Sequence, residues 1–84
     1  MEIRFTQSAR KHRIGRAHAI YVMENYSFAL IKSDNEDKVQ RVWVASDDRG
    51  LELEIVAVVF KDYLLVTHVM PTDLRRRKKT WPQK

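Results

Sequence analysis

The sequence predicts an α+β domain with the order β-α-α-β-β-β-β, in which an antiparallel sheet carries two short helices on one face. Two observations predict this class. Residues 39–70 contain three runs rich in Val, Ile and Leu separated by short polar turns, which is typical of consecutive β-hairpins. Residues 7–25 instead place apolar side chains at helical spacing. Helices this short need the apolar face of a sheet, so both parts should share one core.

The N-terminal part predicts one strand and two helices. Residues 2–6 alternate between apolar and polar side chains and should form a short strand. The helical stretch that follows runs to about Asn25 and has Gly15 in its middle, where glycine would cost up to about 1 kcal/mol relative to alanine in a continuous helix. We therefore expect a break at this glycine and two helices, over residues 7–14 and 16–23.

The second half of the chain predicts the rest of the sheet. In the middle hairpin strand the odd-numbered residues from 51 to 59 are apolar and should face the core, whereas the opposite face starts with Glu52 and Glu54 and ends apolar. These two glutamates would repel RNA unless basic side chains pair with them. The sequence predicts strands over 26–31, 39–46, 51–60 and 64–70, a polar loop over 32–38, and turns at 47–50 and 61–63.

The chain is expected to leave the sheet at Pro71, because proline cannot continue a central strand. A short basic helix or tail should follow, and if it is helical the helix should span residues 74–79. Residues 1–73 are therefore predicted to form a single domain, and residues 74–84 a basic C-terminal extension.

Composition excludes several classes of protein. A chain of 84 residues can hold one core. The absence of cysteine excludes a disulfide scaffold and thiolate metal sites, and no nucleotide-binding loop or metalloprotease motif is present. No apolar run approaches the roughly 20 residues that span a bilayer, and the opening Met-Glu-Ile-Arg-Phe lacks the apolar run of a signal peptide. We expect a cytoplasmic protein without a membrane segment, cofactor or metal.

The net charge of +5 is concentrated at the ends of the chain. Residues 1–70 carry ten basic and ten acidic side chains, whereas residues 71–84 carry six basic side chains and one acidic one. Within the balanced part, residues 1–23 are basic, with five Lys or Arg against Glu2. A polyanion such as RNA would therefore be attracted to both ends.

Three histidines are candidates for proton transfer: His12, His18 and His68. His68 stands in an apolar run, on the predicted face of Leu64, Val66 and Met70, where a lone histidine can also be a hydrogen-bonded structural residue. His12 lies in a basic segment and could contact phosphate or belong to a solvated helix face. His18 should be a surface or packing residue.

Two further features admit more than one interpretation. Trp43 stands between Val42 and Val44, so it is either an exposed platform on which a base stacks or part of a second small core. The basic run from Arg75 to Lys79 could bind phosphate or an acidic protein, or serve only as a solubilising tail.

The N-terminal part of the chain carries the pattern Phe5-Thr6-x-x-Ala9-x-Lys11-His12-x-Ile14, followed by Ala19 and by Val22-Met23. This pattern resembles the RelE/ParE-like toxin superfamily, in particular its BrnT-like branch. Arg13 stands where the family usually has glycine. The resemblance covers nearly the whole chain as an order of elements. The final strand of the family usually carries an arginine implicated in RNA cleavage, and residues 67–70 contain none. Either His68 and Arg75–Arg77 replace it, or this chain keeps the fold without the activity.

The resemblance implies the toxin of a type II toxin-antitoxin system, a metal-independent endoribonuclease that acts on mRNA. It implies two partners, a cognate antitoxin protein and RNA, free or on the ribosome. His68 would transfer protons, and Arg75 or Arg76 would bind the scissile phosphate. The residues expected to contact RNA elsewhere are Lys11, His12, Arg13, Arg16, Trp43, Arg77, Lys78 and Lys79.

Other functions are compatible with the same residues. The basic ends could serve a nucleic-acid-binding module that cuts nothing. An apolar sheet edge or the basic tail could instead bind an acidic protein. Some toxins of the superfamily inhibit DNA gyrase, and the sequence does not distinguish that target from RNA.

Overall fold

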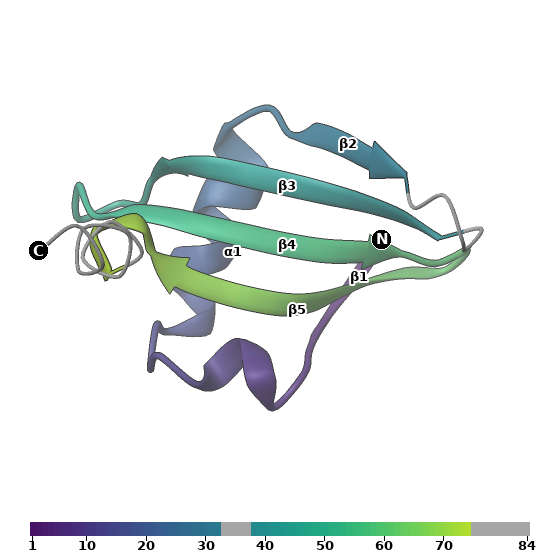
Figure 1. Cartoon of the computed structure of the whole chain (residues 1–84), viewed down its shortest axis with the longest axis horizontal. Coiled ribbons are helices and arrows are strands. Elements are labelled where there is room, and N and C mark those ends of the chain that lie inside the picture. The colour runs from purple at the N-terminus through teal and green to yellow at the C-terminus, as the bar shows by residue number, and fades with distance from the viewer. Residues whose placement is uncertain (33–37, 75–84) are drawn as a thin grey trace, which may run out of the picture.

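One five-stranded sheet organises the protein (Figure 1). The computed structural model describes residues 1–32 and 38–74. The predicted α+β class is confirmed. The elements in chain order are strand β1 (Glu2–Phe5), 3-10 helix η1 (Ser8–Arg10), helix α1 (Arg16–Asn25), and strands β2 (Ala29–Lys32), β3 (Val39–Ser46), β4 (Glu52–Val59) and β5 (Tyr63–Pro71).

The sheet is mixed, so the prediction of an antiparallel sheet is wrong. Its strand order is β1-β5-β4-β3-β2. The three pairs formed by β2 to β5 are antiparallel, but β1 pairs parallel to β5, with Ile3 opposite Leu64. This pairing arises because α1 carries the chain from the β1 edge to the β2 edge, so no hairpin joins β1 to its partner. In Figure 1 α1 crosses behind the sheet, and residues 1–32 and 38–74 place no helix across the face toward the viewer.

The core lies between α1 and η1 and the sheet face that they cover. The apolar odd-numbered residues of β4 face this side as predicted, and Leu53, Ile55 and Ala57 are buried. Helical residues Ala9, Ala19 and Val22 pack against them. The remaining buried members of this core are Trp43, Leu64, Val66 and Val69. We call the opposite face, which turns away from α1, the outer face.

The helices differ from the prediction on one side of Gly15 and agree on the other. The helix expected over 7–14 is only the short η1. It cannot extend because the backbone of Arg13 adopts the left-handed conformation, with φ 58°. After Gly15 the chain enters α1, so the predicted break is confirmed, and α1 continues to Asn25, two residues beyond the expected end.

Arg13 has the left-handed backbone conformation, which glycine adopts with the least strain. We expect Arg13→Gly to raise the free energy of unfolding by about 0.5 kcal/mol, because relief of the left-handed strain exceeds the entropy cost of glycine. Arg10→Gly in η1 is the control and should instead lower it by a similar amount. Urea unfolding of both variants measures the effect, and a lower midpoint for Arg13→Gly would contradict it.

A β-bulge in β5 changes which residues face the core. His68 pairs with Val56 of β4, and the next pair is Val66 with Ala57, which leaves Thr67 as an extra residue. The residues buried in the core are therefore even-numbered before the bulge and odd-numbered after it, at Val69. His68 thus lies on the outer face. The prediction that it shares a face with Leu64 and Val66 is wrong, whereas the prediction that it shares one with Met70 is confirmed.

The turn between β3 and β4 is built around the buried carboxylate of Asp47. Its Oδ1 accepts hydrogen bonds from the backbone N–H groups of Arg49 at 2.8 Å and Leu51 at 3.0 Å. Its Oδ2 accepts from the Arg49 guanidinium at 2.7 and 3.0 Å. Gly50 follows with φ 85°, a conformation that favours glycine. The turn predicted at 47–50 is confirmed.

This turn makes stability depend on pH. Burial by itself would raise the pKa of Asp47, but the hydrogen bonds from Arg49 and Leu51 outweigh it and lower the pKa below its ordinary value of 3.8. A lowered pKa contributes stability that is present above the unfolded-state pKa and is lost as the pH falls through the folded-state pKa. Asp47→Ala should therefore cost about 2 kcal/mol at pH 7, and less as the pH falls below about 4.

Urea unfolding of wild type and Asp47→Ala between pH 7 and pH 2.5 measures this effect. Asp62→Ala removes an exposed carboxylate from the next turn and is the matched control, with little expected change at any pH. A constant difference between wild type and Asp47→Ala across this range would contradict the role of the ionised carboxylate.

Candidate functional site

The outer face brings one predicted catalytic residue, His68, beside a carboxylate. His68 Nε2 of β5 lies 3.5 Å from Glu54 Oε1 of β4. The Glu54 side chain is 15% exposed and that of His68 is 37% exposed, so solvent reaches the imidazole more than the carboxylate. An imidazole and a carboxylate can each serve as acid or base toward a bound substrate.

A second carboxylate on the same face links the pair to the end of the described chain. Glu52 lies two residues before Glu54 on β4, and its Oε1 accepts a hydrogen bond from Thr72 Oγ1 at 2.6 Å. Thr72 directly follows β5, and residues 72–74 begin a helical turn. The pair therefore lies where the chain enters its basic C-terminal extension. Two predictions lie outside the described residues. One is the helix expected over 74–79, of which only Leu74 is described. The other is the set of site residues Arg75, Arg76, Arg77, Lys78 and Lys79.

Apolar side chains surround the histidine and glutamate on the outer face. The pairing register places Val56 beside His68 and Met70 beside Glu54. On β3, Val42 and Val44 occupy the next positions across from Val56 and Glu54, and Val44 is 55% exposed. Charges interact more strongly among apolar groups than in bulk water. The outer face therefore holds His68 and Glu54 among mainly apolar neighbours.

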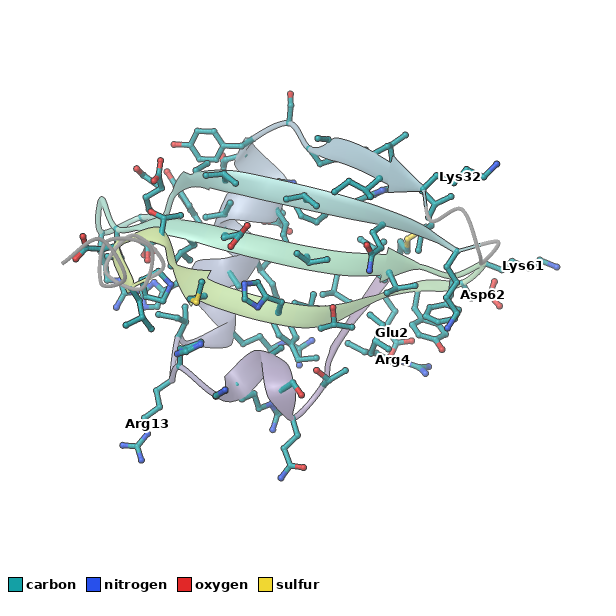
Figure 2. All side chains as sticks on the ribbon, viewed as in Figure 1. Glu2, Arg4, Arg13, Lys32, Lys61 and Asp62 are labelled. Atoms are coloured by element: carbon teal, nitrogen blue, oxygen red, sulfur yellow. The ribbon has the colours of Figure 1, made fainter. Side chains whose placement is uncertain are left out.

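The basic N-terminal segment lies at the β5 side of the sheet. Helix η1 packs against β5, and Lys11, His12 and Arg13 directly follow it. Lys11 and Arg13 are exposed and His12 is half-buried. In Figure 2 the Arg13 side chain projects away from the sheet. Ala9 of η1 belongs to the core, so η1 packs on the helix-covered face of β5, whereas His68 lies on the outer face.

Arg16 belongs to a different surface. Its guanidinium donates a hydrogen bond to the carbonyl oxygen of Ile3 at 3.0 Å and lies 5.3 Å from the centre of the Phe5 ring. These contacts hold the start of α1 against β1. The structure thus gives Arg16 a structural role and does not bring it to the His68 pair.

The prediction that Trp43 is an exposed stacking platform is wrong. Its side chain is buried, with 2% exposure, and it belongs to the same core as Ile55, its partner on β4. It also does not form a second core. The physical reason is the register of β3, which turns Trp43 toward α1 and turns Val42 and Val44 outward.

A cluster at the start of α1 has the composition of a metal site but is explained by structural contacts. Ligand atoms of His18, Asp47 and Asp48 lie within 4.8 Å of one another. Both oxygens of Asp47 are held by the turn and by Arg49. His18 Nδ1 lies 2.6 Å from Asp48 Oδ1 and so ties α1 to the turn between β3 and β4. This cluster fastens the helix to the sheet.

Sequence reasoning missed Glu54 as a member of the site. It treated Glu52 and Glu54 as charges that would need Lys or Arg partners, whereas the structure gives them contacts with Thr72 and His68. The available signal was the position of both glutamates on one face of β4. That signal does not identify His68 as a neighbour, because the bulge at Thr67 sets the register of β5.

Comparison of the chain with protein-family models, with curated proteins and with solved structures finds no match in any of the three. The likeness to BrnT-like toxins therefore rests on the sequence pattern. Among residues 1–32 and 38–74, no helix has the length and apolar character needed to cross a membrane.

Proposed function

We propose that the protein is a RelE/BrnT-like toxin that cleaves mRNA as a metal-independent endoribonuclease. The observation that carries the proposal is the contact between His68 and Glu54 at 3.5 Å on the outer face. The basic charge of residues 71–84 in the sequence and the basic residues that follow η1, which packs against β5, support an RNA substrate.

The pair supplies the two proton transfers that RNA cleavage requires. Glu54 accepts the proton of the ribose 2′-hydroxyl as its oxygen attacks the adjacent phosphorus. Protonated His68 donates a proton to the 5′-oxygen as the bond between phosphorus and that oxygen breaks. The products are a 2′,3′-cyclic phosphate and a 5′-hydroxyl end. Transfer of a proton from Glu54 to His68 restores the starting state.

Basic side chains bind the phosphates in this proposal. Arg75 or Arg76 neutralises the charge that develops on the scissile phosphate. Lys11, His12 and Arg13 contact the RNA backbone beside β5. A cognate antitoxin would cover the outer face, whose exposed Val44 suits a protein partner. Such a toxin acts in the cytoplasm, where mRNA is translated.

Mapping of mRNA 5′ ends in a translation extract supplied with the purified protein tests the proposal. New ends that carry a 5′-hydroxyl are expected, and the same cleavage of free RNA in EDTA would show that neither ribosome nor metal is required. Cleavage confined to the extract would place the reaction on the ribosome. Unchanged ends and unaffected translation would contradict the proposal.

One observation favours a second candidate function. The outer face carries Val42, Val44 and Val56, which suit a protein-interaction domain that does not cut RNA. A domain of this kind should show no RNA affinity at low salt and no new RNA ends. RNA affinity without cleavage would instead indicate a non-catalytic nucleic-acid-binding module.

A further inference from the structure

A cleft opens on the helix-covered side of the sheet, on the opposite face from His68. It has a volume of about 490 Å³ and lies where α1 ends and the chain turns toward β2. This size suits a small organic molecule. Its walls are mostly apolar, with Met23 from α1, Tyr26 and Phe28 from the segment before β2, and Leu64 and Trp43 from the sheet.

Two hydrogen-bond donors in the wall of the cleft have no acceptor. Arg41 Nε and Trp43 Nε1 are both buried, and neither finds a partner within residues 1–32 and 38–74. Trp43 as a whole is only 2% exposed. A buried donor left without an acceptor costs about 1–3 kcal/mol. An acceptor that reached either donor, after a shift of the side chains that cover it, would recover part of this energy.

The Arg41 guanidinium provides the positive charge of the cleft. It lies 4.3 Å from the centre of the Phe28 ring, and that ring packs against Trp43 at 5.5 Å. No carboxylate of the described chain forms an ion pair with Arg41. The cleft thus combines aromatic walls with a guanidinium that forms no ion pair with a carboxylate of the described residues, and Glu24 lines the same cleft.

We propose that this cleft binds a small aromatic carboxylate. The ring of the ligand packs among Tyr26, Phe28 and Trp43, and its carboxylate accepts hydrogen bonds from Arg41. A neutral apolar ligand would leave the charge of Arg41 without a partner. A multiply charged anion such as a phosphate would lose its hydration to apolar walls and face Glu24, which also lines the cleft.

The probe is 2-naphthoate, compared with the neutral amide of the same shape, 2-naphthamide. Proton–nitrogen correlation spectra of the full chain report directly on the two donors, since Arg41 Nε–H and Trp43 Nε1–H each give a signal. Trp81→Phe assigns the two tryptophan signals. We expect saturable shifts of both signals and about tenfold tighter binding of naphthoate than of naphthamide.

Arg41→Met removes the charge and keeps a side chain of similar length. It should weaken naphthoate binding about tenfold and leave naphthamide binding unchanged. Lys61→Met is the matched control, because Lys61 projects from the turn between β4 and β5 in Figure 2, and it should change neither affinity. Circular dichroism verifies that both variants fold.

Three outcomes would overturn the proposal. One is the absence of shifts at Arg41 and Trp43 up to about 5 mM naphthoate. Another is equal affinity of wild type for naphthoate and naphthamide, which would reduce the cleft to an apolar surface. The third is shifts confined to the outer face around His68. The comparison of the two probes on wild type decides the question even if Arg41→Met does not fold, and none of these measurements depends on RNA cleavage.

Discussion

Replacement of His68 by alanine is expected to lower the rate of RNA cleavage by about a hundredfold to ten-thousandfold. The imidazole is the proposed donor of the proton to the leaving 5′-oxygen, and its loss leaves water to perform that step. The fold should survive, because the side chain lies on the outer face and is 37% exposed. The measurement is the rate at which new 5′-hydroxyl ends form.

The neighbouring carboxylate gives an independent test of the same site. Glu54→Gln keeps the shape of the side chain and removes its ability to accept a proton, so a loss of about a hundredfold or more is expected. His18→Asn is the control for loss of a histidine, because His18 lies on α1, on the other side of the sheet, and contacts Asp48. Full activity of either Glu54→Gln or His68→Ala would remove that residue from the mechanism.

Replacement of Trp43 by alanine is expected to cost about 3–5 kcal/mol of the free energy of unfolding. The indole is buried at the centre of the core, where alanine would leave a large cavity. A domain of this size has a total stability of about 4–13 kcal/mol, so the loss is a large fraction of it. Urea unfolding followed by far-ultraviolet circular dichroism measures the loss.

The adjacent residue supplies the control for this experiment. Val44 is the next residue on β3, and its side chain is on the outer face and 55% exposed. Val44→Ala should therefore cost less than about 1 kcal/mol. Equal losses for the two variants would contradict the placement of Trp43 in the core.

The parts of the fold that local sequence determines were predictable. The alternation of β4 identified the core face that contains Leu53, Ile55 and Ala57, and Gly15 marked the start of α1. The parallel pairing of β1 with β5 was not predictable in this way, because it depends on the path of the chain through α1. The left-handed backbone at Arg13 was not predictable either, because an arginine side chain does not indicate that conformation.

The candidate site was predictable only in part, for reasons of register. His68 was recognisable as a histidine in an apolar run, but its face depends on the bulge at Thr67, and a one-residue shift moves every later side chain to the other face. Its contact with Glu54 follows from the same register. The position of Trp43 was ambiguous because Val42 and Val44 on either side are also apolar, so hydrophobicity did not distinguish the two faces of β3.

The two edge strands of the sheet have a consequence for how the protein behaves when it is concentrated. β1 and β2 are each four residues long, and β1 displays the ion pair between Glu2 and Arg4 at 2.9 Å. Edges this short offer a second molecule few free backbone hydrogen bonds, and charged side chains hinder its approach. Growth of the sheet from the β1 edge is therefore disfavoured. The described β2 edge is equally short, but it exposes the apolar side chains of Leu30 and Ile31, so its length and not its charge limits such growth there.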